Sequence, residues 1–114
     1  MAALTAVTPT NAGTLNAGAA VAASDTISTA VMGRIGCYLE IINGNASPDV
    51  MTISDAGLTP SGNALTGGTY AGSVTNATSK VFLIRREQAV AATGLVTVTH
   101  SVTATVTYKL YPVG

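Results

Sequence analysis

Residues 96–110 read VTVTHSVTATVTYKL, and this stretch decides the fold class. Seven of its eight even-numbered positions are apolar, and every odd-numbered position is polar. Alternation with a period of two predicts a β-strand with one face in the core and a ladder of threonine side chains on the other. Because its fifteen residues exceed the usual strand length of about 3–10, the stretch is either one long strand bent across a sandwich or two strands hinged near residues 100–102.

A second alternating pattern begins at residue 36. Cys37, Leu39 and Ile41 share one face of a predicted strand. Residues 43–49 are almost all turn formers, and residues 50–54 form a second strand pattern. Residues 36–54 therefore predict a hairpin with a seven-residue loop.

The segments between these two patterns carry weaker signals. Residues 55–79 hold five glycines and predict loops, with one weak strand near residues 69–74. The continuous apolar run at residues 81–84 predicts a short, fully buried strand. Residues 88–93 are consistent with a short helical turn or a loop.

These segments add up to about six to eight short strands with no convincing helix. The expected fold is therefore all-β, an antiparallel β-sandwich or jelly-roll-like domain. Residues 31–114 are assigned to the sandwich. Residues 1–30, rich in Ala, Thr and Gly, are assigned to an amino-terminal arm or to edge strands. Alanine content alone also permits a helix over residues 17–23, and the arm is either ordered by a neighbouring subunit or loosely held.

Composition excludes several classes of function. The 114 residues suffice for one domain, and five basic residues balance five acidic ones. Charged residues make up 9% of the chain, against about 25% in a typical globular protein, so we expect neither nucleic acid nor an anionic membrane as a partner. No apolar run reaches the roughly 18 residues of a membrane span, and no basic segment marks a secretory signal. Near-zero charge favours association, which suggests a surface covered by partners.

Groups that could support catalysis are few. His100 is the only histidine and lies on the apolar side of its strand pattern, which favours a buried, hydrogen-bonded or interface residue over a catalytic base. Cys37 shares the core face of its strand, so we expect an inert thiol. Asp49 and Asp55 flank one strand, but the carboxylate density of a calcium loop is missing. We therefore expect no enzyme, no metal and no cofactor.

Three motifs point to a family. Residues 12–25 form an Ala/Gly/Thr-rich arm that leads to an acidic residue. The turn NGNASP at residues 43–48 is followed by the strand pattern VMTI, and residues 96–106 match a closing V-x-V-T-[YH]-S-x-[VT]-x-[VA] strand pair. With these motifs the chain resembles, over nearly its whole length, the small head decoration or minor capsid proteins (head fiber proteins) of tailed bacteriophages. It departs from that pattern in its longer glycine-rich middle and in His100, where an aromatic residue is common.

The resemblance implies a structural virion protein. Such a protein is made in the cytoplasm of the bacterial host and sits on the outer surface of the capsid, as a homotrimer at threefold or quasi-threefold positions. It stabilises the shell by bridging subunits of the major capsid protein. The possible capsid or subunit contacts are Arg34, Arg85, Arg86 and Glu87. The alternative for residues 85–87 is a solvated strand end, and the alternative function is a carbohydrate- or host-surface-binding module on the virion.

Overall fold

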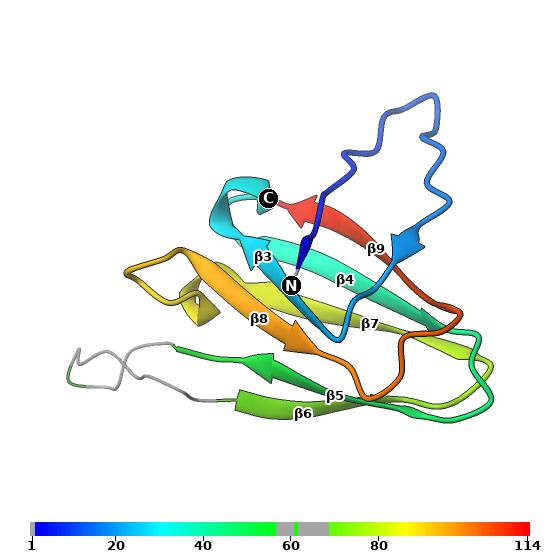
Figure 1. The fold of residues 1–114 in the computed structure, drawn as a ribbon. Helices are drawn as coiled ribbons and strands as arrows, with labels where there is room; N and C mark the ends of the chain where they lie inside the picture. Colours follow the sequence, from blue (N-terminus) through cyan, green and yellow to red (C-terminus); the bar gives the residue numbers. More distant parts are fainter. Residues whose placement is uncertain (1, 57–60, 62–68) are drawn as a thin grey trace.

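The computed structural model describes residues 2–56, 61 and 69–114 and shows two β-sheets packed face to face (Figure 1). The predicted all-β sandwich is confirmed. All strand pairs are antiparallel except β1 with β3. Sheet A contains, in spatial order, β1 (Ala2–Ala3), β3 (Ser24–Ser28), β8 (Leu95–Thr99), β5 (Asp49–Ser54) and β6 (Thr69–Val74). Sheet B contains β2 (Ala19–Ala20), β9 (Val106–Val113), β4 (Gly36–Asn43) and β7 (Thr78–Arg85).

The alternating stretch at residues 96–110 forms two strands rather than one. β8 lies in sheet A between β3 and β5, whereas β9 lies in sheet B between β2 and β4. The connection between them crosses from one sheet to the other, and its backbone is tied down at both ends. The amide of His100 donates to the Ala23 carbonyl (3.0 Å), and the amide of Gly44 donates to the Thr105 carbonyl (3.0 Å). Thr105 has a φ of 58°, so the chain leaves the extended conformation just before β9 begins.

The predicted hairpin over residues 36–54 is wrong, although both of its strands exist. β4 pairs along its whole length with β7 and β9, and β5 pairs with β6 and β8 in the other sheet. A seven-residue loop can close a hairpin or cross the roughly 10 Å between stacked sheets, so its length did not decide between them. The Asn43 side chain fixes this crossing by donating to the carbonyls of Ser47 and Val74 (both 3.0 Å).

The apolar run at residues 81–84 is not the fully buried strand that was predicted. It belongs to β7, the edge strand of sheet B, where successive side chains point to opposite faces. Ile84 is fully buried, but Val81 is 57% exposed and Leu83 is 38% exposed. An apolar run therefore places apolar side chains on the outside of the sandwich as well as in its core.

The core lies between the sheets. It is built from side chains that alternate inward along the long strands, chiefly Ile27, Leu39, Ile41, Met51, Ile53, Ile84, Val96, Val98, Val106 and Leu110. β3 lies inside sheet A, so the sandwich also includes residues before position 31. β1 and β2 are two-residue edge strands, and β2 occupies the segment for which a helix was the alternative. The strand expected near residues 69–74 is observed as β6, whereas of the loop expected at 57–68 only residue 61 is described.

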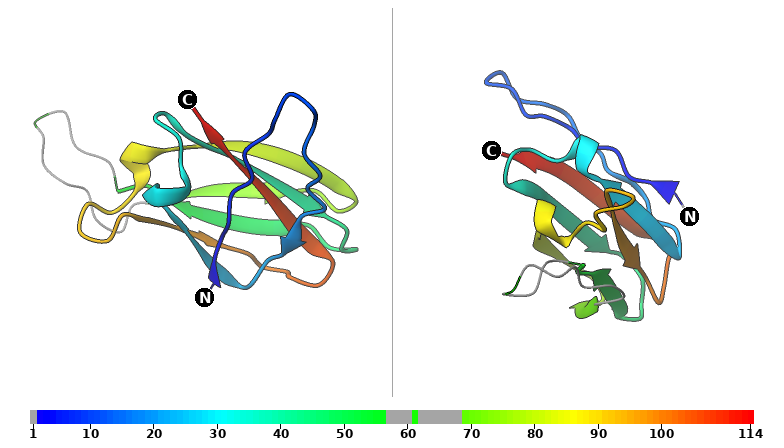
Figure 2. Two further views of the ribbon diagram at one scale, coloured as in Figure 1. Left: turned by 90° about the horizontal axis from the view of Figure 1, so that it is seen from above. Right: turned by 90° about the vertical axis from the view of Figure 1, so that its left-hand side faces the viewer.

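Two short 3-10 helices, η1 (Thr29–Val31) and η2 (Arg86–Gln88), lie at one end of the sandwich. The carboxyl terminus reaches the same end, because β9 runs antiparallel to β4 and Val113 pairs with Gly36. Figure 2 shows this end from two further directions. We refer to it as the arginine end, after Arg34, Arg85 and Arg86 in its strands and turns.

Candidate interaction surfaces

The outer face of sheet A carries several hydroxyl groups together with one apolar side chain, Val50, which is 58% exposed beside Thr52 on β5. Thr26 lies opposite Thr97, and Thr52 lies opposite Thr99 in the register of neighbouring strands. The hydroxyls of Thr52 and Thr99 are hydrogen-bonded to each other. The sequence predicted one continuous threonine ladder over residues 97–109, and this is only partly correct. Thr97 and Thr99 lie in β8 of sheet A, whereas Thr107 lies in β9 of sheet B.

The outer face of sheet B is apolar and aromatic. Strand register places Leu83, Tyr38 and Tyr111 side by side in one row across β7, β4 and β9. Tyr38 is 46% exposed, and Val81 follows on the same side of β7. We call Tyr38, Val81, Leu83 and Tyr111 the sheet-B face. Contiguous apolar surface of this kind marks interaction sites more often than scattered exposed residues do.

Charged residues are few on this face. In the row next to Leu83, Tyr38 and Tyr111, Glu40 lies opposite Lys109, and both side chains are half-buried. Arg85 is exposed at the end of β7, two residues beyond Leu83 and on the same side of the strand. The sheet-B face is therefore apolar along the Leu83 row, while its Val81 lies opposite Glu40 in the row that also contains Lys109.

The four residues predicted as contacts come together at the arginine end. Arg34 is exposed just before β4, near Arg85, which pairs with Gly36. Arg86 has an internal role, because its Nη1 donates to the carbonyls of Thr29 (3.0 Å) and Gly33 (3.2 Å) and so holds η1 against η2. Its guanidinium is partly used inside the chain, which leaves Arg34 and Arg85 as the more available cations.

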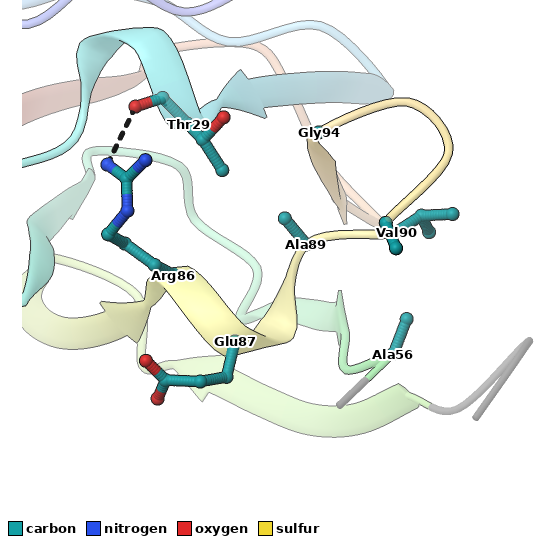
Figure 3. A pocket seen from close by; sticks show the side chains of 8 residues that line it. Thr29, Ala56, Arg86, Glu87, Ala89, Val90 and Gly94 are labelled. Carbon is teal, nitrogen blue, oxygen red and sulfur yellow. Dashed lines mark hydrogen bonds between the residues drawn. The ribbon is translucent and has the colours of Figure 1, made fainter. Parts of the chain in front are cut away.

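A pocket that no sequence pattern predicted opens beside η2 (Figure 3). Its volume is about 360 Å³, and most of its wall is formed by small apolar residues. The pocket is lined by Thr29, Ala56, Arg86, Glu87, Ala89, Val90, Ala91 and Gly94. Gly94 has a φ of +67°, which closes the turn from Val90 and lets the Gly94 carbonyl accept from the Thr29 amide (2.9 Å). The run of small residues after η2 is the one sequence signal that could have indicated this hollow.

The only histidine is buried and paired with Asp49, as its place on the apolar side of the pattern suggested. Its Nδ1 lies 2.6 Å from Asp49 Oδ2, and both side chains are fully shielded from solvent. The other carboxylate oxygen of Asp49 accepts from the Ser101 amide (3.0 Å). His100 Nε2 has no hydrogen-bond partner. This pair ties the connection between β8 and β9 to the start of β5, and sequence reasoning did not identify Asp49 as the partner.

Cys37 is an inert core residue. Its side chain is fully buried, and burial raises the pKa of the Cys37 thiol from 9.0 to about 11. A protonated, inaccessible thiol is a poor nucleophile. The structure thus agrees with the expectation drawn from its position beside Leu39 and Ile41.

Burial changes the charge balance of the surface. The carboxyl groups of Asp25 and Asp49 are fully buried, whereas Glu40, Asp55 and Glu87 reach the surface. The chain therefore has five basic side chains but only three accessible carboxylates. Three of the basic residues are at the arginine end. The accessible charged side chains of this neutral chain are therefore mainly basic, and they are concentrated at the arginine end.

Within residues 2–56, 61 and 69–114, no group of three or more His, Cys, Asp or Glu side chains is placed to hold a metal ion. The same part of the chain contains no helix long and apolar enough to cross a membrane. A scan of the chain against protein-family models finds no match, and neither curated proteins nor solved structures show a significant similarity to it.

Proposed function

We propose that the chain is a structural virion protein that decorates the outer surface of a tailed-phage capsid and stabilises it by bridging subunits of the major capsid protein. The proposal rests on one observation, the contrast between the two outer faces of the sandwich. Sheet A presents threonine hydroxyls with the isolated apolar Val50, whereas sheet B presents the contiguous row Leu83, Tyr38 and Tyr111. The family resemblance read from the sequence supports the same function, including a homotrimer on the virion and synthesis in the host cytoplasm.

The sheet-B face is the surface that docks on the shell. Its side chains project from three hydrogen-bonded strands, so they lose little conformational freedom on binding. Burying apolar surface contributes about 25 cal/mol per Å², and a standard interface covers roughly 800 Å² on each partner. Val81, 57% exposed, and Tyr38, 46% exposed, have the most surface to lose. Arg34 and Arg85 lie beside this contact and supply polar interactions at its rim.

The test compares one substitution on each face, using capsids that lack the protein and the purified chain. Leu83→Lys places a charge in the sheet-B face, and Thr52→Lys places the same charge on the exposed face of sheet A. We expect Leu83→Lys to abolish co-sedimentation with capsids and Thr52→Lys to retain it, with both variants folded by circular dichroism. Undiminished binding of Leu83→Lys would show that this face is not the contact.

Salt separates an apolar contact from an electrostatic one. Exposed ion pairs contribute about 0–1 kcal/mol each, and the screening length falls to about 3 Å at 1 M salt. Binding should therefore persist in about 1 M NaCl, with losses no larger than those of Arg34→Ala or Arg85→Ala. Release in moderate salt would mean that the arginine end, not the sheet-B face, holds the capsid.

One observation favours the alternative of a carbohydrate- or host-surface-binding module. Tyr38 and Tyr111 lie side by side on an accessible face, and sugar rings stack on such aromatic side chains. Imaging and adsorption assays of virions with the gene deleted distinguish the two functions. Loss of surface protrusions and of head stability supports the decoration protein, whereas intact heads that no longer adsorb to cells support the binding module.

A further inference from the structure

The loop between β1 and β2 projects away from the sandwich beyond β9 (Figure 1). Residues 8–15 are all exposed, and Leu15 is 100% exposed. A single exposed leucine is common on protein surfaces. Leu15 is unusual because it belongs to a projecting loop whose residues 8–15 are all exposed.

This loop is ordered by its own hydrogen bonds. The Gly13 amide donates to the Thr10 carbonyl (3.0 Å), and the Thr10 amide donates to Thr14 Oγ1 (3.0 Å). At its base the Val7 amide donates to the Leu110 carbonyl (2.9 Å), and the Gly18 amide donates to Asn16 Oδ1 (3.1 Å). The projection is therefore pre-organised, which lowers the entropic cost of inserting it into a partner.

The pocket beside η2 has the chemistry and size to receive Leu15. Ala56, Ala89 and Ala91 form much of its apolar wall, and Arg86 and Glu87 belong to its polar part (Figure 3). Its volume of about 360 Å³ exceeds the roughly 150 Å³ of an apolar cavity left by removal of one buried leucine side chain. The space holds the leucine side chain together with adjoining backbone of the loop.

The loop and the pocket cannot meet within one chain. The loop projects from the edge of sheet B formed by β2 and β9, whereas the pocket lies beside η2 at the arginine end. The views of Figures 1 and 2 show the two well apart. A projection and a complementary hollow at different places on one chain produce a head-to-tail contact between copies, which closes into a ring or continues as a filament.

We propose that the Leu15 loop of one copy inserts into the η2 pocket of the next copy. The contact joins copies of this chain without help from any other protein. That it closes as a ring of three rests on the proposed function, because the trimer is an expectation of the family resemblance. The amino-terminal segment then acts as an arm that binds a neighbouring subunit.

The test is the molar mass of the purified full-length chain in sedimentation equilibrium. Leu15→Asp replaces the exposed apolar side chain of the loop with a charge, and Ala91→Arg fills the pocket. The controls are Leu15→Met, which keeps this side chain apolar, and Ala92→Arg, which changes an exposed neighbour outside the pocket lining. We expect a multiple of 11.3 kDa for the native chain and both controls. Both test variants should weaken association roughly tenfold or more, as loss of a central interface side chain does.

Mixing the two test variants gives a sharper readout. A Leu15→Asp copy keeps an intact pocket, and an Ala91→Arg copy keeps an intact loop, so the mixture regains one contact and forms a heterodimer that neither variant forms alone. A native chain that stays at 11.3 kDa at high concentration would overturn the proposal, as would a mixture that stays monomeric. Leu83 lies outside the loop and the pocket, so Leu83→Lys should keep the native molar mass in this experiment while losing capsid binding. The two proposals are thus distinguished by separate measurements.

Discussion

Removal of the Asp49 carboxylate should destabilise the fold strongly. Asp49→Ala leaves the His100 ring without its 2.6 Å partner and the Ser101 amide without its 3.0 Å acceptor, in a site fully shielded from solvent. Breaking a buried pair from one side costs about 3–5 kcal/mol. A domain of this size has roughly 5–15 kcal/mol of stability, so Tm should fall by more than about 10 °C. Urea unfolding followed by circular dichroism measures the loss, because the chain has no tryptophan.

The matched control is Thr103→Ala, an exposed position in the same connection between the sheets. It should change stability by no more than about 0.5 kcal/mol. A double-mutant cycle with His100→Ala isolates the pair, and the double variant should lose far less than the sum of the two single losses. If Asp49→Ala costs no more than Thr103→Ala, the carboxylate and the imidazole are not buried against each other.

Three further outcomes follow from burial and backbone geometry. The unfolded Cys37 thiol ionises near pH 9, while the folded one stays protonated to about pH 11. The free energy of unfolding should therefore fall by about 2–3 kcal/mol between these pH values, relative to that of Cys37→Ala. Equal pH slopes in urea melts of both proteins would contradict this. Val106→Asp should cost several kcal/mol, and Thr107→Asp on the outer face of β9 far less; similar losses of Tm would reverse the facing. Ala77 has a φ of 61°, so Ala77→Gly should raise stability by roughly 1 kcal/mol in the same melts, and a loss would mean that the turn is unstrained.

The strands and their buried faces could be predicted because alternation is a local property. Val96, Val98 and Val106 sit in the core as the period of two requires. The assignment of strands to sheets is not local. β4 and β5 each have one apolar face, and the connection between them fits a hairpin as well as a crossing, so their separation depends on which distant strands complete each sheet.

The candidate surfaces were predictable to the extent that they are contiguous in the chain. Arg85, Arg86 and Glu87 are adjacent in the sequence, but Arg34 reaches them only through the register that pairs Gly36 with Arg85. The partner of His100 is 51 residues away, and no spacing rule selects Asp49 over the other carboxylates. The sheet-B face could not be predicted for another reason. A continuous apolar run resembles a buried strand even when the strand lies at a sheet edge.

The two proposed contacts reinforce each other because they occupy separate surfaces. The loop and the pocket join copies at the edge and the arginine end, which leaves each sheet-B face free. In the proposed ring, several identical sheet-B faces would be presented together to the capsid. Once one face has docked, the others bind at the high effective concentration set by the ring, and avidity can exceed a single affinity by about 10²–10⁴. A modest apolar contact at each sheet-B face would then be sufficient to hold the proposed ring on the shell.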